Sequence, residues 1–275
     1  MKFLIFGSKG WLGGLIKDYL LKEDYEVIVC DHDINLSDRI ISEVNVVINC
    51  AASTNIDWCE KNKWHCFWNN VMGAQNLARS CRINGQKYVF ISSACIFESD
   101  QCYQNYEDVE GPFFVESDHP NPKCFYTETK VMAEKLIQEI NSESLIIRPR
   151  LPISEIPHPR NTLNKLLQYD KINSNQESVT VIEDMLPVLL ELILKNESGI
   201  FHLVNEGTIS PSEMAVLLGH KFLTISKSQQ DLRLVLEGRA KRVTTYVGSE
   251  RISLLPNIRE RIKSVVAKYK AHAEN

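Results

Sequence analysis

The sequence lacks a CxxC pair, although it contains eight cysteines, most of which lie in apolar runs or on predicted helices. This pattern disfavours a disulfide framework and a cysteine-rich metal site, so we expect reduced thiols, no bound metal and a cytoplasmic location. No apolar run reaches membrane-spanning length, and the apolar start of the chain ends at Gly7, too early for a signal peptide core. Internal repeats, low-complexity tracts and long linkers are absent as well, which disfavours repeat architectures.

Excess positive charge is also missing. The chain has 31 Lys and Arg against 35 Asp and Glu, a formal net charge of -4 and a pI near 6.0. We therefore expect no nucleic-acid partner and no anionic membrane surface as a partner. With 275 residues, of which 44% are hydrophobic and 24% charged, the chain has the composition of one large or two small globular domains.

A glycine-rich segment follows the first predicted strand. Residues 2–6 are continuously apolar, and residues 7–14, GSKGWLGG, lead from them into a helical pattern that reaches residue 21. Glycines between a strand and a helix let the backbone approach a pyrophosphate at the helix N-terminus. The alternative is a plain glycine-rich turn, which requires neither the strand before it nor the helix after it. The sequence therefore predicts a dinucleotide site with these contacts: Gly7, Lys9, Gly10, Trp11, Leu12 and Gly13.

The next two predicted strands carry further cofactor candidates. The strand at 26–30 ends in Asp31, and an acid at this place accepts a hydrogen bond from the adenosine ribose and favours NAD. Lys9, His32 and Arg39 instead favour a 2′-phosphate, so the residues leave the choice open, and Leu36 is predicted beside the adenine. The strand at 44–50 runs into Ala51 and Ala52, which are small enough for a cofactor to lie against the backbone.

Polar side chains follow the fourth predicted strand, residues 87–91. Because the carboxyl ends of parallel strands face the ligand crevice of a doubly wound sheet, we expect Ser93 and Cys95 to reach it. They are two residues apart and would project to the same side of an extended backbone. The alternative role of Cys95 is that of a small hydrophobic side chain buried in the core. The polar, acidic and proline-bearing residues 98–122 predict a long loop, a candidate substrate lid.

Tyr126 and Lys130 lie four residues apart on a predicted helix and so share one face. A lysine ammonium near a phenol favours the phenolate and eases proton transfer near neutral pH. A carbonyl reductase needs such a proton for the alcohol oxygen when hydride arrives at carbon. The alternative is an ordinary pair on a solvated helix face.

Strands and helices alternate as far as residue 148, and a proline-broken, basic segment begins after Pro149. This order predicts an α/β fold with a doubly wound parallel sheet and a smaller C-terminal domain. We expect an NAD(P)-binding domain over residues 1–150 and a substrate-binding region over residues 151–275. A segment around residues 178–205 is expected to return to the sheet.

These signals, in this order, resemble the extended short-chain dehydrogenase/reductase superfamily over nearly the whole chain. Within it the chain resembles the dTDP-4-dehydrorhamnose reductases and, more narrowly, the bifunctional 3,5-epimerase/4-reductases that form UDP-L-rhamnose. The segments that carry this resemblance are GWLGG (10–14), DWCE (57–60), CIFE (95–98), FY with TK (125–126 and 129–130), RPRLPIS (148–154), and PRN with Lys165 (159–161). The resemblance implies a Rossmann-like fold, NADPH with NADH as the alternative, and a sugar-nucleotide substrate linked to UDP or dTDP.

The resemblance also implies roles for individual residues. The reductase residues fall on Ser93, Tyr126 and Lys130. The Ser-x-Cys arrangement resembles GDP-fucose synthase, in which the cysteine is an epimerisation acid/base, and the second epimerisation residue would fall on Lys165. Reductases proper carry aspartate and tyrosine where this chain has Ala94 and Cys95, which favours the bifunctional branch.

The substrate contacts are expected outside this set. Their candidates are Asn55, Arg150, Arg160 and Asn161, because guanidinium groups match phosphate oxygens bidentately; ordinary loop solvation is the alternative. Two other functions stay open, a 4-ketoreductase without epimerase activity and a non-catalytic regulatory subunit of the same fold. A homodimer is also open.

Overall fold

The computed structural model describes residues 1–30, 43–111 and 113–274. The chain forms two compact units. Unit 1 contains residues 1–96, 124–148 and 189–201, and unit 2 contains residues 97–123, 149–188 and 202–275. This division differs from a single boundary near residue 150, because the long loop after residue 96 belongs to unit 2 and the returning segment is shorter than expected.

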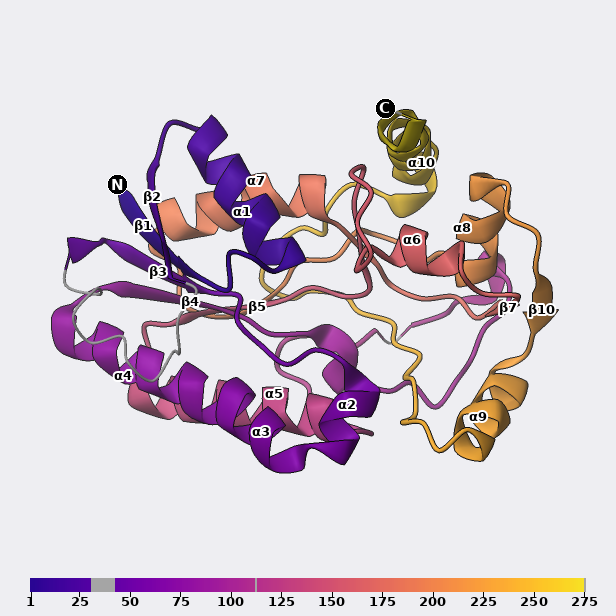
Figure 1. The fold of residues 1–275 in the computed structure, drawn as a ribbon, viewed down its shortest axis with the longest axis horizontal. Coiled ribbons are helices and arrows are strands. Elements are labelled where there is room, and N and C mark those ends of the chain that lie inside the picture. Colours follow the sequence, from indigo (N-terminus) through magenta and orange to yellow (C-terminus); the bar gives the residue numbers. More distant parts are fainter. Residues whose placement is uncertain (31–42, 112, 275) are drawn as a thin grey trace. The chain divides into compact units, whose positions relative to one another are not determined.

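A six-stranded sheet forms the centre of unit 1 (Figure 1). Its strands are β1 (Lys2–Phe6), β2 (Glu26–Cys30), β3 (Val46–Asn49), β4 (Lys87–Ile91), β5 (Leu145–Arg148) and β9 (Gly199–His202). Their order is β2-β1-β3-β4-β5-β9, and the pairs from β2 through β5 are parallel. The predicted α/β class with a parallel sheet is confirmed. The order reverses between β1 and β3, and in such sheets ligands bind beside this switch point.

Helices cover both faces of this sheet (Figure 1). On one face lies α1 (Trp11–Lys22), and on the other lie α4 (Gly73–Asn84) and α5 (Phe125–Ile140). Buried apolar side chains of the strands pack against α4 and α5, as Val47 and Phe90 do against Leu77 and Ile137. This two-sided cover explains why the strands are continuously apolar.

The helical segment between β3 and β4 is interrupted. It consists of α2 (Ile56–Lys61), α3 (Lys63–Phe67), a π-helical turn (Trp68–Met72) and α4. Asn62 breaks the run between α2 and α3, with a φ of -127° and a ψ of 51° that no helix adopts. The π-helical turn is of interest because such turns are frequent at functional sites.

Unit 2 has its own core and two small parallel sheets. Its strands are β6 (Pro152–Ile153) with β8 (Thr180–Val181), and β7 (Lys171–Asn173) with β10 (Leu223–Ile225). Its helices are α6 (Thr162–Leu166), α8 (Pro211–Leu218), α9 (Lys227–Leu236) and α10 (Ile258–Glu274), and α7 (Ile182–Leu194) begins here and ends in unit 1. A capping box formed by Ser210 and Glu213 opens α8. A second box at Ser226 and Gln229 opens α9, which the sequence reading missed.

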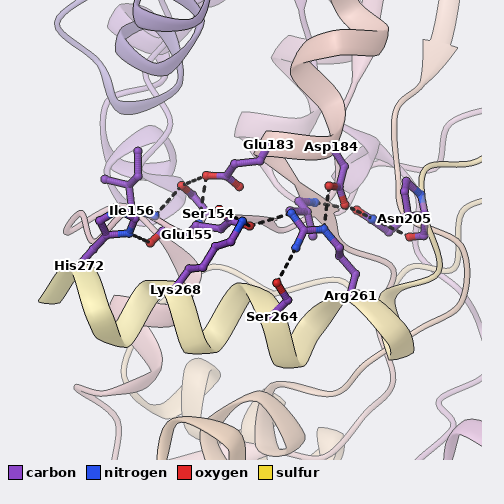
Figure 2. Close-up of polar contacts among 12 residues, drawn as sticks. Ser154, Glu155, Ile156, Glu183, Asp184, Asn205, Arg261, Ser264, Lys268 and His272 are labelled. Atoms are coloured by element: carbon purple, nitrogen blue, oxygen red, sulfur yellow. Dashed lines mark hydrogen bonds and ion pairs between the residues drawn. The ribbon is translucent and has the colours of Figure 1, made fainter.

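The basic face of α10 is held by carboxylates of unit 2 (Figure 2). Glu155 pairs with Arg261 at 2.7 Å and with Lys268 at 3.0 Å, and Asp184 accepts from Arg261 at 2.9 Å. The ring of His272 bonds to the backbone carbonyl of Glu155 at 3.0 Å. This part of the basic face therefore anchors the last helix to its own unit.

Several general expectations can be compared with the structure. None of the helices in the described part of the chain combines the length and apolar character needed to cross a bilayer. Within residues 1–30, 43–111 and 113–274, no group of three or more His, Cys, Asp or Glu side chains could hold a metal ion. The eight cysteines are free thiols.

Candidate active site

The glycine loop between β1 and α1 has the close contacts that a dinucleotide site requires. Gly7 has a φ of +78°, and a Cβ atom there would lie 2.7 Å from the backbone nitrogen of Ala51. A Cβ atom on Gly13 would lie 2.3 Å from the carbonyl oxygen of Gly7. Helix α1 begins at Gly10 without a side-chain cap, so its first N–H groups can face an anion. The loop therefore fits a dinucleotide diphosphate.

Gly13→Ala should weaken cofactor binding. Because the added methyl group meets backbone rather than a flexible side chain, α1 must move away from the loop. We expect the Kd for NADPH to rise about tenfold or more, a change of about 1.4 kcal/mol or more. Fluorescence titration measures it. Gly111→Ala is the control, because a Cβ there would come no closer than 3.8 Å to Phe113, and equal affinities in the two variants would contradict this role of the loop.

The end of β3 is joined to α5 through the π-helical turn. Asn70, which is 1% exposed, accepts a hydrogen bond from the backbone N–H of Ser53 at 2.7 Å and donates to its carbonyl at 3.1 Å. The same amide donates to the hydroxyl of Thr129 on α5 at 3.0 Å. The predicted cofactor contacts Ala51 and Ala52 are half-buried in the segment just before Ser53. Asn70 therefore fixes this segment against the helix that carries Tyr126.

Ser93, Tyr126 and Lys130 come together in unit 1. The side chain of Ser93 acts to lower the pKa of Tyr126, so the two hydroxyl groups lie close together. Lys130 is 2% exposed, and its ammonium donates to the carbonyl of Ile91 at 3.0 Å. It also lies over the ring of Phe90, 4.6 Å from the ring centroid. The predicted helix spacing thus places both side chains beside the end of β4.

The pKa values differ from the expectation that Lys130 lowers that of Tyr126. Burial, aided by Cys95 and Cys124, raises the pKa of Tyr126 above its usual value, and the side chain of Ser93 opposes this rise. Burial lowers the pKa of Lys130 to about 8. Desolvation disfavours the charged form of both groups. The phenol is therefore protonated at neutral pH, which is the form that donates a proton.

Cys95 lies near this group, but not on extended backbone as the sequence suggested. Ala94–Ile96 form a 3-10 turn, and the backbone N–H of Cys95 donates to the hydroxyl of Ser93 at 3.1 Å. Serine hydroxyls commonly bond to the N–H group two residues on, and this bond favours a turn over a strand. Cys95 is partly exposed and acts electrostatically on Tyr126. Cys95 therefore lies near Tyr126, although the predicted extended backbone was wrong.

The remaining cofactor candidates differ in burial, and some lie outside the described residues. Lys9 is exposed in the glycine loop, Trp11 is buried and Leu12 is half-buried at the start of α1. The other predicted contacts of the adenosine half lie outside the described residues: Asp31, His32, Leu36 and Arg39. The part of these residues in the choice between NADPH and NADH stays a prediction.

Two substrate candidates are engaged inside unit 2. Arg150 is 4% exposed, forms an ion pair with Glu177 at 2.5 Å and donates to the carbonyl of Val243 at 3.0 Å. Asn161 is fully buried, and its side chain accepts from the N–H of Leu163 at 3.1 Å at the start of α6. These contacts support structural roles, and their predicted substrate contacts stay predictions.

The other substrate candidates are exposed. Burial is the largest cause of the lowered pKa of His158, and the charges of Arg160 and Lys165 lower it further. Both cations therefore lie near His158 in unit 2. Asn55, in unit 1, caps α2 by accepting from the N–H of Trp58 at 3.0 Å. Their contacts with a substrate also stay predictions.

Comparisons with known proteins show the family of the chain. The sequence matches the family described as RmlD substrate binding domain over residues 1–230. The chain belongs to the RmlD family. A bifunctional dTDP-4-dehydrorhamnose 3,5-epimerase/dTDP-4-dehydrorhamnose reductase of Arabidopsis thaliana is 34% identical over 225 residues, 77% of this chain and 72% of that protein.

A longer plant relative matches this RmlD-family chain over part of its length. It is a trifunctional UDP-glucose 4,6-dehydratase/UDP-4-keto-6-deoxy-D-glucose 3,5-epimerase/UDP-4-keto-L-rhamnose-reductase of Arabidopsis thaliana, 34% identical over 224 residues. The match covers 78% of this chain and 33% of that protein, so the chain spans about a third of its length.

Solved structures share the fold over nearly the whole chain. The L780 UDP-rhamnose synthase of Acanthamoeba polyphaga mimivirus has a TM-score of 0.85 and 26% identity, with 98% of this chain and 99% of that chain covered. A dTDP-4-dehydrorhamnose reductase of Bacillus anthracis in complex with NADP has a TM-score of 0.78 and 20% identity, covering 97% and 98%. The predicted resemblance to the rhamnose reductases is confirmed.

The sequence reading missed the residues that support the catalytic side chains. Asn70 and Thr129 connect the end of β3 to α5, and Glu134 connects α5 to Ser92 and Arg148. The spacing of Glu134, four residues after Lys130, was a usable signal. Its partner Arg148 belonged to a family motif but carried no predicted role.

Proposed function

We propose that this chain reduces the C4 ketone of a nucleotide-linked 4-keto-6-deoxy sugar with NADPH and also epimerises C3 and C5. The product would be the nucleotide L-rhamnose, with UDP or dTDP as the nucleotide. The observation that carries the proposal is the joint placement of Ser93, Tyr126 and Lys130 beside a glycine loop that fits a dinucleotide. The bifunctional plant relative supports the pairing of the two activities, since this chain covers 72% of it.

Reduction uses the hydrogen bonds of the catalytic group. Ser93 and Tyr126 hold the C4 oxygen, and a reduced nicotinamide, when bound, supplies the hydride to C4. Tyr126, whose raised pKa keeps the phenol protonated beforehand, then gives its phenolic proton to the more basic alkoxide that develops. Lys130, protonated at pH 7 with a pKa of about 8, places positive charge beside the site.

Epimerisation uses the same polarised ketone. The protons on C3 and C5 are acidic because the ketone oxygen accepts hydrogen bonds from Ser93 and Tyr126, which stabilise the enolate. Cys95 is the proposed base, and its electrostatic contact with Tyr126 supports a place near the ketone. Lys165 is the proposed proton donor on the opposite face. Arg160, near Lys165, is proposed to contact the diphosphate.

The proposed function predicts one product. Incubation with UDP-4-keto-6-deoxyglucose and NADPH should oxidise NADPH and form UDP-L-rhamnose, with the stereochemistry at C3, C4 and C5 read by NMR. Oxidation with retained D-configuration would leave a 4-ketoreductase alone, and no turnover would contradict catalysis. The same assay with NADH tests the cofactor: a higher kcat/KM with NADH would transfer the ribose contact to Asp31.

A further inference from the structure

Helix α5 carries a third polar residue in line with the two that the proposed reaction uses. Tyr126, Lys130 and Glu134 are spaced four apart, so their side chains form one row along the helix. The phenol of Tyr126 lies near the side chain of Ser93, which acts to lower its pKa, and the ammonium of Lys130 donates to the last carbonyl of β4. The carboxylate of Glu134 accepts from the hydroxyl of Ser92. The row therefore faces three consecutive residues at the end of β4 and is hydrogen-bonded to two of them.

Glu134 is itself held by β5. The Nε atom of Arg148 donates to its carboxylate oxygens at 3.0 and 3.2 Å, and the Nη2 atom donates at 2.6 Å. Both side chains are 3% exposed. A planar guanidinium that donates to both oxygens allows the carboxylate a single orientation. The backbone N–H of Ser92 also bonds to β5, at 2.7 Å from the carbonyl of Ile147, so the end of β4 and Glu134 share one support.

Glu134 also acts on the charge of Lys130. Burial lowers the pKa of Lys130 to about 8, and Glu134 is the largest influence that opposes this. Besides Tyr126 on the same helix face, three thiols act on Lys130: Cys50 after β3, Cys66 on α3 and Cys59 on α2. Burial raises the pKa of Cys50 to about 12 and that of Cys59 further, so these two thiols are neutral at pH 7. The carboxylate of Glu134 therefore favours the ammonium form.

We propose that Glu134, whose carboxylate is oriented by Arg148, is a positioning residue that fixes Lys130 relative to Ser93 at the end of β4. The inference rests on the proposed function, in which Lys130 and Ser93 act together. Its physical reason is that the two catalytic side chains come from different elements, a helix and the loop after a strand. Without the bonds of Glu134, the polar contacts between α5 and the end of β4 would come from the reacting groups alone, and a displacement of about 1 Å can cost about a hundredfold in rate.

The test replaces the buried pair by apolar residues, Glu134→Leu together with Arg148→Met. Such an exchange is often neutral or stabilising, whereas removing one partner leaves a buried charge unpaired. We expect the double variant to keep its thermal midpoint and to bind NADPH with a Kd within about threefold, because the glycine loop is untouched. Its kcat for ketone reduction should fall by about 10- to 100-fold, with KM for the ketone nearly unchanged.

The pH profile adds a readout that a merely structural pair would not move. Activity that needs the ammonium of Lys130 falls as the pH rises through its pKa, which is about 8. Since Glu134 raises that pKa, its removal should shift the alkaline limb of kcat to lower pH. An unshifted limb with full kcat in the folded double variant would overturn the inference.

Two single variants complete the test. Glu139→Gln removes a carboxylate from the exposed face of α5 and should leave kcat and the pH profile unchanged. Ser92→Ala removes only the hydroxyl through which Glu134 reaches β4, and kcat should fall by about 3- to 10-fold. If the double variant does not fold, Ser92→Ala decides, and unchanged kcat there contradicts the inference.

The unmodified protein separates this inference from the proposed function. If it does not reduce UDP-4-keto-6-deoxyglucose with NADPH, the proposed function fails, and the role of Glu134 in it fails too. If it does, and the folded double variant turns over equally fast, the role of Glu134 alone is refuted.

Discussion

Tyr126→Phe should slow ketone reduction by a factor on the order of a hundred or more, because it removes the proton donor for the C4 alkoxide. The substitution deletes one hydroxyl, which lies near Ser93, and it leaves the aromatic ring in place. Phenylalanine keeps nearly the same volume, so the packing of α5 should survive. Single-turnover oxidation of NADPH in the presence of UDP-4-keto-6-deoxyglucose measures the effect.

Cofactor binding separates this loss from a general defect. The Kd for NADPH should stay close to that of the unmodified protein, because Lys130 and the glycine loop are unchanged. Tyr25→Phe is a matched control: its ring packs edge-on against Phe3, with centroids 5.2 Å apart, on the other side of β1 from β4. A Tyr126→Phe variant that reduces the ketone at a near-normal rate would show that the tyrosine and lysine are only structural.

Cys95→Ser should abolish proton exchange at C3 and C5 while hydride transfer to C4 continues. A serine hydroxyl has nearly the size of a thiol, but it is far too weakly acidic to supply the anionic base. Ser93, Tyr126 and Lys130 are untouched, and the bond between Ser93 and residue 95 uses the backbone N–H, which serine retains. The measurement is deuterium uptake at C3 and C5 in D2O without cofactor, followed by NMR.

The second half of this experiment supplies NADPH and ketone that is already epimerised. Reduction at the normal rate together with lost exchange would support two activities served by separable residues. Undiminished deuterium uptake would return Cys95 to the role of a small hydrophobe. Cys124→Ser is the matched control, because this thiol also acts on Tyr126 but is buried, 6% exposed, at the start of α5. Its exchange rate should be normal.

Local patterns predicted the elements that form the site. A glycine loop between an apolar strand and a helix needs only neighbouring residues, and Gly7 and Gly13 have the close contacts that this pattern implies. The spacing of Tyr126 and Lys130 placed them on one helix face because an α-helix repeats every 3.6 residues or so. The turn after β4 was not predicted. The apolar pattern of the strand ends before Ser93, and it does not show that the Ser93 hydroxyl accepts from the N–H of Cys95 and so favours a turn.

The sequence by itself determined the α/β class, the glycine loop and the helix with its catalytic pair, because these depend on residues within a few positions of one another. The tertiary structure alone decided which polar groups meet across long separations. Glu134 bonds to Ser92, which is 42 positions away in the sequence, and Arg150 bonds to Glu177, which is 27 positions away. Such pairs exist because a buried charge must be compensated wherever the fold places it, and no local pattern records that partner.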